Sequence, residues 1–384
     1  MKNRSSYLMG LIDSYSDAVA PRGPASLSDQ DLEHLYGIGL ASIALVRLGP
    51  KLDELSDESR LLLRSADLTA RVVYGQIRDT TGEVLDTALR HDIPVVLLKG
   101  ISIAEDLYDE PHHRLMGDVD VLVSVEQAND LYELLDELGY SSPNGAQKPT
   151  LPDGHHHLEE TCQPDSGISV EIHTSLFSAT PMSDEHLFQI PNIWKLTEPA
   201  EYFGVPCLRF RPELQLLYTV AHWAVDQKWA RNVISINDVV LMLRRYDDRL
   251  DWRLIATWLP DNPLLANCLT VILTFFKDIG IMNIPATITH EIEGSARQIG
   301  AANMKLLHQL MLKFPLSNRR RSPSPVTILA VRIFWQAMLE PRHKLLRPIV
   351  SVTRIIFRKT RDKSILSSIP GRVRTFIRLM RQAQ

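Results

Sequence analysis

The sequence predicts an α+β fold, with β-strands in the middle of the chain and helices on both sides. Residues 94–98 form a short apolar run, and residues 117–123 alternate acidic with apolar side chains, as strands do. Two further strand-like stretches, 155–161 and 168–174, are separated by a Pro- and Gly-containing turn. Apolar residues elsewhere recur at the three- to four-residue spacing of amphipathic helices.

The first 90 residues predict a helical N-terminal subdomain. Ser28 and Asp29 are suitable N-caps for a first amphipathic helix. A longer helical stretch covers about residues 57–90, with Gly75 and Gly82 as candidate interruptions. This segment contains no group of catalytic residue types, so we expect it to pack against the strands that follow.

The middle of the chain alternates strands and helices. The strand at 94–98 leads through Lys99-Gly100 into a helical segment, and a polar turn then leads to the strand at 117–123. A helix at about 125–138 and a short last strand at 205–210 complete this part.

The C-terminal half predicts helices throughout, at about residues 213–224, 234–246, 252–259, 263–279 and 296–312. A stretch rich in Arg, Ser and Pro at 318–325 predicts a linker. We therefore expect four parts: a helical N-terminal subdomain (1–90), a strand-containing core (91–211), a helical domain (212–317) and a basic helical tail (318–384).

The charge of the chain is unevenly distributed. Residues 311–384 carry 17 Lys and Arg against 2 Asp and Glu, so with a net charge of −4 overall the remainder carries −19. Such a tail suits an anionic partner, which could be a polyanion, a membrane surface or the chain's own acidic part.

Other bulk properties indicate a globular protein of the cytoplasm. A chain of 384 residues is long enough for two or three domains with a sizeable core. It shows no signal-like start and no apolar run near the roughly 18 residues that span a membrane. Its three scattered cysteines suggest neither a disulfide framework nor a metal site, which is typical of a reducing compartment.

Two carboxylates lie in the otherwise apolar strand at 117–123. Because side chains alternate along a strand, Asp118 and Asp120 point to the same face. Like charges on a half-buried face are costly unless a cation lies between them, and carboxylate oxygens favour Mg²⁺ or Mn²⁺. Glu171, from a strand that can pair with this one, is the third carboxylate. Three such groups could hold two metal ions about 4 Å apart, an arrangement used for phosphoryl or nucleotidyl transfer.

Gly100 offers a phosphate-binding position. It follows a strand and begins a helix, where glycine allows close approach and the helix N-terminus presents free N–H groups. Lys99 and Ser102 are suited to phosphate contacts at the same place.

Three segments carry a family pattern: LKG at 98–100, RLMGDVDVLV at 114–123 and VEIH at 170–173. Together they resemble the active-site pattern of the DNA polymerase β-type nucleotidyltransferase superfamily, most closely its bacterial group of largely uncharacterised nucleotidyltransferases. The resemblance extends over about residues 90–245. It implies a small mixed β-sheet flanked by helices, with the helical domain at 212–317 closing over the nucleotide.

The resemblance also implies roles for single residues. The two aspartates would be metal ligands, with Glu171 as the third carboxylate. Arg114 would contact the triphosphate or support the structure, and a salt bridge to Asp109 or Glu110 is the alternative. The turn Gly100-Ile101 differs from the Gly-Gly or Gly-Ser of the wider superfamily, and its long spacing to the DVD strand argues against an antibiotic-modifying enzyme.

Several histidines and one aspartate are weaker candidates. The three consecutive histidines at 155–157 cannot all face one ion on a strand, and only His157 is a candidate to line the cleft. His173 shares a face with the third carboxylate, which suggests a supporting or substrate contact. His222 and Asp238 lie in predicted helices, where they would either contact nucleotide or acceptor or tie helices together.

We therefore expect a Mg²⁺- or Mn²⁺-dependent nucleotidyltransferase that moves an NMP from an NTP such as ATP to a hydroxyl or phosphate acceptor, releasing pyrophosphate. The acceptor could be a small molecule, a peptide or a protein, and the base preference stays open. One alternative is nucleotidylation of a Ser, Thr or Tyr side chain of a peptide or protein. Another is a catalytically silent scaffold that binds nucleotide and docks a partner through the basic tail.

Overall fold

The computed structural model describes residues 29–279 and a few single positions between 289 and 308. Short gaps lie at 38, 144–150, 152–154, 178–189, 191, 226–232 and 247–248. The expected linker and basic tail at 318–384, and almost all of the expected helix at 296–312, lie outside the described residues. No helix in the described part of the chain has both the length and the apolar character needed to cross a membrane.

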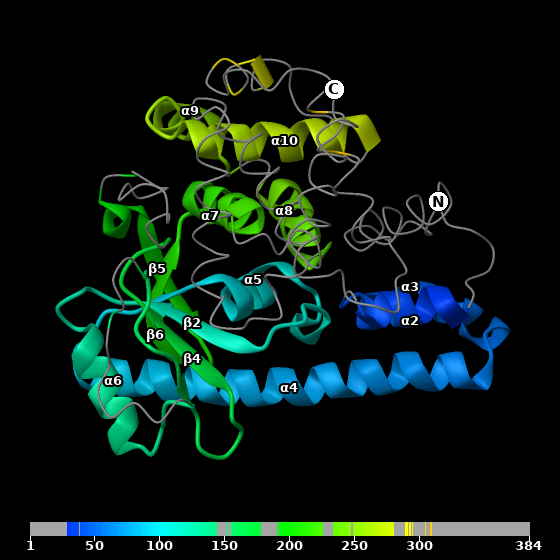
Figure 1. The fold of residues 1–384 in the computed structure, drawn as a ribbon, viewed down its shortest axis with the longest axis horizontal. Coiled ribbons are helices and arrows are strands. Elements are labelled where there is room, and N and C mark those ends of the chain that lie inside the picture. The colour runs from blue at the N-terminus through cyan, green and yellow to red at the C-terminus, as the bar shows by residue number, and fades with distance from the viewer. Residues whose placement is uncertain are drawn as a thin grey trace, which may run out of the picture.

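A six-stranded mixed sheet forms the centre of the fold, in the order β3-β4-β2-β1-β6-β5 (Figure 1). Its strands are β1 (Val96–Leu97), β2 (Asp118–Leu122), β3 (Thr161–Cys162), β4 (Ser169–His173), β5 (Thr197–Tyr202) and β6 (Val205–Phe210). The pairs β2·β4 and β1·β6 are parallel, and the other pairs are antiparallel. The expected α+β class with a small mixed sheet is confirmed.

The strand β5 was not expected from the sequence, because its Pro and two Glu residues reduce its strand propensity. It lies at the edge of the sheet, where these residues are tolerated. A tight turn joins it to β6, and both turn residues, Phe203 and Gly204, have positive φ angles of 57° and 79°. This conformation matches the primed turns of β-hairpins.

Helix α4 (Asp57–Arg90) is the longest element, with 34 residues. The side chain of Ser56 caps its start by accepting a hydrogen bond from the backbone N–H of Ser59 at 3.2 Å. The expected interruptions at Gly75 and Gly82 are wrong, since the helix continues through both. Tertiary packing of its apolar face offsets the cost of about 1 kcal/mol for each glycine.

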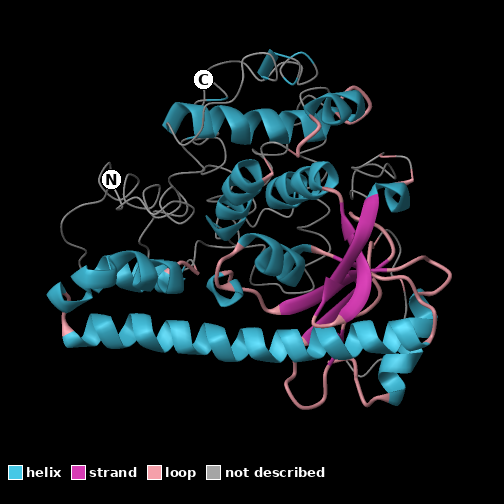
Figure 2. Cartoon of the chain, turned by 180° about the vertical axis from the view of Figure 1, so that it is seen from behind, coloured by secondary structure: helices cyan, strands magenta, loops and turns pink. Residues whose placement is uncertain are grey.

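The remaining helices lie on the two sides of the sheet or pack on other helices. Figure 1 shows α4 on one side of the sheet and α5, α7 and α8 on the other. In Figure 2, which is the view from behind, α4 runs across the strands. Their bounds are α2 (Asp29–Gly37), α3 (Ala41–Leu48), α5 (Lys99–Leu107), α6 (Ala128–Glu137), α7 (Pro212–Val225), α8 (Val233–Arg245), α9 (Trp252–Trp258) and α10 (Pro263–Ile279). Three 3-10 helices add to these: η1 (Gly49–Glu54), η2 (Pro111–His113) and η3 (Ile193–Leu196).

The two faces of the sheet belong to two separate hydrophobic cores. Val119 and Val121 of β2, with Val170 and Ile172 of β4, are buried in the core that includes α4 and α6. Leu122, on the opposite face of β2, is buried in the core of α5, α7, α8 and α10. Because side chains alternate along a strand, the acidic side chains of β2 and β4 point toward the side of α5, α7 and α8.

The central strand β1 offers a test of the core. Leu97 is fully buried, so we expect Leu97→Ala to lower the free energy of unfolding by about 2 to 5 kcal/mol, because it leaves a cavity between the sheet and α4. Leu61→Ala is the matched control, since Leu61 on α4 is 67% exposed and should change stability by less than about 0.5 kcal/mol. Urea unfolding measures both, and equal effects would contradict this packing.

Candidate active site

The register of β2 and β4 brings together carboxylates that are far apart in the sequence. In this parallel pair Asp118 lies beside Ser169, Asp120 beside Glu171, and Leu122 beside His173. Asp120 and Glu171 therefore point in the same direction from neighbouring strands, on the face of the sheet toward α5, α7 and α8. The pairing that the sequence suggested for these two strands is present.

His173 joins these two carboxylates. Its Nε2 lies 2.8 Å from Oδ1 of Asp120 and 3.3 Å from Oε2 of Glu171. The three side chains offer possible ligand atoms that all lie within 4.8 Å of one another. His173 is completely buried and Asp120 nearly so, whereas the side chain of Glu171 is 24% exposed. Glu171 is thus the member of this group that faces the solvent.

Lys99 supplies a positive charge to the same group. Its Nζ donates to Oδ1 of Asp120 at 3.1 Å, the oxygen that His173 also contacts. Lys99 begins α5 with a φ of 37°, and its Nζ lies 5.8 Å from the centre of the Tyr218 ring on α7. Lys99, which we expected to bind phosphate, therefore forms an ion pair with one of the clustered carboxylates.

The pKa values of both carboxylates are lowered. Burial disfavours the charged form of Asp120, but Lys99, His173 and His222 together lower its pKa well below the ordinary value. The hydrogen bond from His173 lowers the pKa of Glu171, against the effects of burial and of the Asp120 charge. Both groups are therefore anionic at neutral pH. The His222 ring on α7 has its centre 6.0 Å from that of Tyr218, the ring that Lys99 approaches.

Gly100 lies next to the backbone of Asp118. Asp118 is half-buried at the start of β2, on the same face as Asp120, but it is not one of the three clustered side chains. A Cβ on Gly100 would lie 3.7 Å from the backbone oxygen of Asp118 and from Nη1 of Arg114. The start of α5 and the start of β2 are therefore neighbours in space.

Ser102 is directed elsewhere. Its side chain is buried, and its hydroxyl lies 3.2 Å from the hydroxyl of Tyr202 on β5. His157 also has a local contact, since its Nδ1 lies 2.6 Å from the carbonyl oxygen of Leu158. The ring of His157 lies 5.3 Å from that of His173, so it contributes to the surroundings of the acidic group.

Arg114 forms a buried ion pair with Asp238 of α8. Its Nε and Nη2 donate to both carboxylate oxygens at distances of 2.9 to 3.2 Å. Tyr108 donates to the same carboxylate at 2.7 Å, and the Asn237 amide donates to the Tyr108 hydroxyl at 2.9 Å. Asp238 is completely buried and Arg114 nearly so. This network ties α8 to the segment that leads into β2.

The partner of Arg114 differs from the alternative that the sequence suggested. The structure pairs it with Asp238, and Arg245 forms the ion pair with Asp109. Burial opposes the charge of Arg114, but Asp238 and more weakly Asp118 raise its pKa. Both acids therefore favour the charged form of Arg114. No sequence pattern pointed to Tyr108 or Asn237.

We expect Asp238→Asn to destabilise the fold by about 3 to 5 kcal/mol, because it leaves a buried guanidinium without its counter-charge. The double variant Arg114→Met/Asp238→Leu should be more stable than Asp238→Asn, since it removes both charges. The matched control is Arg245→Gln, which breaks an exposed pair worth at most about 1 kcal/mol. Urea unfolding measures all three, and an Asp238→Asn effect as small as that of the control would contradict the buried pair.

Comparison with known proteins supports the family resemblance of the sequence. A family model described as "Uncharacterised nucleotidyltransferase" matches residues 40–259. No curated protein and no solved structure matches the chain. The matched range begins one residue before α3, includes every strand of the sheet and ends after α9. Because it covers more than half of the 384 residues, the chain belongs to this family of uncharacterised nucleotidyltransferases.

Proposed function

We propose that this protein transfers a nucleoside monophosphate from an NTP to a hydroxyl or phosphate of an acceptor, with release of pyrophosphate. The observation that carries the proposal is the β2–β4 register, which sets Asp120 beside Glu171 with His173 bridging them. The family supports the general class of reaction. The acceptor is a small molecule, a peptide or a protein.

The acidic residues fit a divalent cation. Asp120, Glu171 and His173 have possible ligand atoms within 4.8 Å of one another, and Asp118 lies on the same face of β2. Both clustered carboxylates are held in their charged form, which hard cations such as Mg²⁺ or Mn²⁺ prefer. We propose the three carboxylates as ligands. When bound, such an ion supplies a positive charge for the triphosphate and lowers the pKa of the acceptor hydroxyl.

His173 has a positioning role in this proposal. Its Nε2 contacts one oxygen each of Asp120 and Glu171, so it fixes the direction of both carboxylates. Nitrogen is a poor ligand for Mg²⁺, which also favours a hydrogen-bonding role. Glu171 is the partly exposed carboxylate of this cluster, so we assign to it the role of accepting the proton of an acceptor hydroxyl.

The start of α5 is the proposed phosphate position. The N–H groups of its first turn, at Gly100, lie next to the start of β2, and a helix N-terminus favours anions. Lys99 donates to Asp120, and its Nζ would be available to a phosphate if that carboxylate held a cation. Ser102 contacts Tyr202 and Arg114 contacts Asp238, so we assign these two residues to holding α5 and the β2 entry in place.

The position of the transferred label tests the reaction class. The purified chain is incubated with Mg²⁺ or Mn²⁺, a metabolite or protein fraction as acceptor, and NTP labelled at either the α- or the γ-phosphate. We expect only the α-label to move to the acceptor, together with release of pyrophosphate. Label in small molecules or in a protein band separates the acceptor classes. Transfer of the γ-label would contradict the proposal, and nucleotide binding without any transfer would favour the silent scaffold.

The proposed ligands have a sharper test. We expect Asp118→Asn, Asp120→Asn and Glu171→Gln each to lower α-label transfer by about 100-fold or more, because each removes a charge that the cation needs. Glu201→Gln is the matched control, since Glu201 is an exposed acid on edge strand β5. Excess EDTA should abolish transfer by the wild type. Full transfer by Asp120→Asn would rule out this site.

Lys99→Met tests the phosphate position. We expect the KM for NTP to rise about 10- to 100-fold, which is the effect of losing one charge-assisted hydrogen bond worth about 1.5 to 3 kcal/mol. Lys99→Arg should recover part of the loss. Lys51→Met, which changes an exposed lysine of η1, should leave the KM unchanged. An unaltered KM in Lys99→Met would place the phosphates elsewhere.

A further inference from the structure

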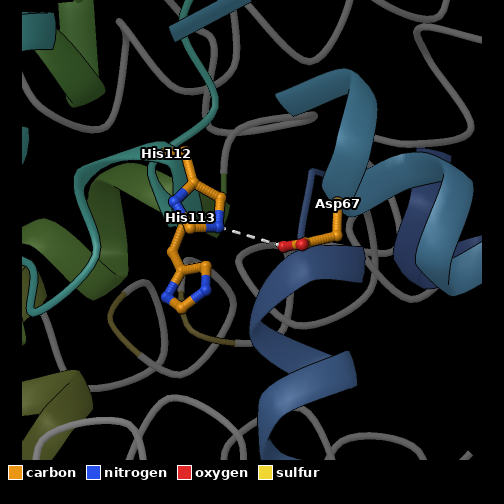
Figure 3. Close-up of side chains that lie close together, drawn as sticks. All are labelled: Asp67, His112 and His113. Carbon is orange, nitrogen blue, oxygen red and sulfur yellow. Dashed lines mark hydrogen bonds and ion pairs between the residues drawn. The ribbon is translucent and has the colours of Figure 1, made fainter. Parts of the chain in front are cut away.

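A second group of possible metal ligands lies away from the acidic residues of β2 and β4. It consists of Asp67 on α4 and of His112 and His113 in η2 (Figure 3). All three residues are buried, with exposures of 8%, 4% and 3%. Their possible ligand atoms lie within 4.8 Å of one another. Two imidazoles therefore meet, inside the protein, a carboxylate that lies 45 residues before the first of them in the chain.

The local structure aims these side chains at each other. Pro111 begins η2, and its short 3-10 turn places the His112 and His113 rings next to each other, with centres 4.3 Å apart and planes tilted by 60°. Arg71, one turn further along α4, donates to Oδ2 of Asp67 at 2.8 Å. The other carboxylate oxygen, Oδ1, lies 3.1 Å from Nε2 of His112. Figure 3 shows the His112 ring directed at this carboxylate.

Two imidazoles lie near one carboxylate in this arrangement. Nε2 of His112 is within hydrogen-bond distance of Asp67, and a ring nitrogen of His113 lies within 4.8 Å of the same group. Imidazole nitrogens and carboxylate oxygens are both common ligands of metal ions in proteins.

We propose that Asp67, His112 and His113 form a binding site for one Zn²⁺ ion. Two nitrogens and one carboxylate oxygen are a ligand set for zinc, with a fourth position left for water. Ligand atoms of a tetrahedral zinc site lie about 3.3 Å apart, for bonds of about 2.0 Å. The pair Asp67–His112 is already close to this spacing, and the ligand atom of His113 lies within 4.8 Å of both.

Glu110 lies near the second ring nitrogen of His112, Nδ1, and could hold its proton when Nε2 binds a metal ion. Oε2 of Glu110 lies 3.6 Å from Nδ1 of His112. Metal-bound histidines commonly direct their second nitrogen to a carboxylate, which fixes the tautomer and the ring orientation. With the metal bound, Nε2 of His112 would carry the lone pair toward the ion, and the proton would lie on Nδ1, facing Glu110.

A metal ion here would fasten the segment before β2 to α4. His113 directly precedes Arg114, and the chain continues through Gly117 to Asp118 at the start of β2. The site would thus hold the path of this segment from the α4 side. This role does not depend on the nature of the nucleotide acceptor, and it differs from that of the oxygen-rich site on β2 and β4.

Cobalt binding tests the proposal with the full chain. The metal-free protein is titrated with Co²⁺, whose visible absorption is intense when the ion has four ligands. The β2–β4 site is silenced by Asp118→Asn/Asp120→Asn/Glu171→Gln. We expect this variant to bind one Co²⁺ per chain with the intense spectrum, and added Zn²⁺ to displace it.

Variants in the silenced background identify the ligands. His112→Asn, His113→Asn and Asp67→Asn should each weaken Co²⁺ binding at least about tenfold and remove the intense spectrum. His91→Asn is the matched control, since His91 is an exposed histidine at the end of α4, and it should bind as the parent does.

Folding is checked separately. Far-UV circular dichroism identifies the variants that fold, and Zn²⁺ should raise the Tm of the silenced parent but not that of folded His113→Asn. The proposal is overturned if a folded His112 or His113 variant keeps the parent's spectrum and affinity. It is equally overturned if the parent binds no cobalt, or binds it only with the weak spectrum of six-coordinate ions.

Discussion

The parallel pairing of β2 with β4 is the constraint on which the rest of the site depends. Val170 and Ile172 are buried against α4 and α6, and this fixes which face of β4 turns inward. A slip of one residue would bury Glu171 in that core and turn Val170 and Ile172 toward α5, α7 and α8, so the hydrophobic pattern protects the register. The same backbone ladder that stabilises the sheet therefore sets Asp120 beside Glu171.

Burying these acids has an electrostatic cost that nearby cations offset. Asp120 is almost fully buried, and Lys99 and His173 both contact its Oδ1. Arg114 likewise offsets the cost of burying Asp238, with which it forms an ion pair in the interior. Buried charges of this kind are more important for placing groups than for raising stability, because desolvation cancels much of their attraction. Their position next to the start of β2 is consistent with that role.

Local patterns in the sequence placed β1, β2, β4 and β6, but they predicted the other two strands and the long-range contacts poorly. β5 was not expected, and the strand expected at 155–161 overlaps the observed β3 (Thr161–Cys162) at one residue only. Alternation placed the acids of β2 on one face, and the position of Glu171 between two apolar residues gave its direction. No local rule could give the partner of Arg114, which lies 124 residues away, or direct Ser102 toward Tyr202. The sequence predicted a helix at 57–90 but not its continuity through Gly75 and Gly82, because tertiary packing outweighs the low helix propensity of glycine. Asp67 gave no signal of its own, and the adjacent histidines of η2 were the one visible hint of the second cluster.

The segment between α5 and β2 is held at several points by residues distant in sequence. Tyr108 and Arg114 both contact Asp238 of α8, and His112 contacts Asp67 of α4. The geometry of Asp118 at the start of β2 therefore depends on two helices outside the sheet. If selection acts on that geometry, those helices must be retained together with the strands. The matched family range has this property, because residues 40–259 include α4 and α8 in addition to every strand. The network that positions the start of β2 is consequently larger than the sheet that carries the carboxylates.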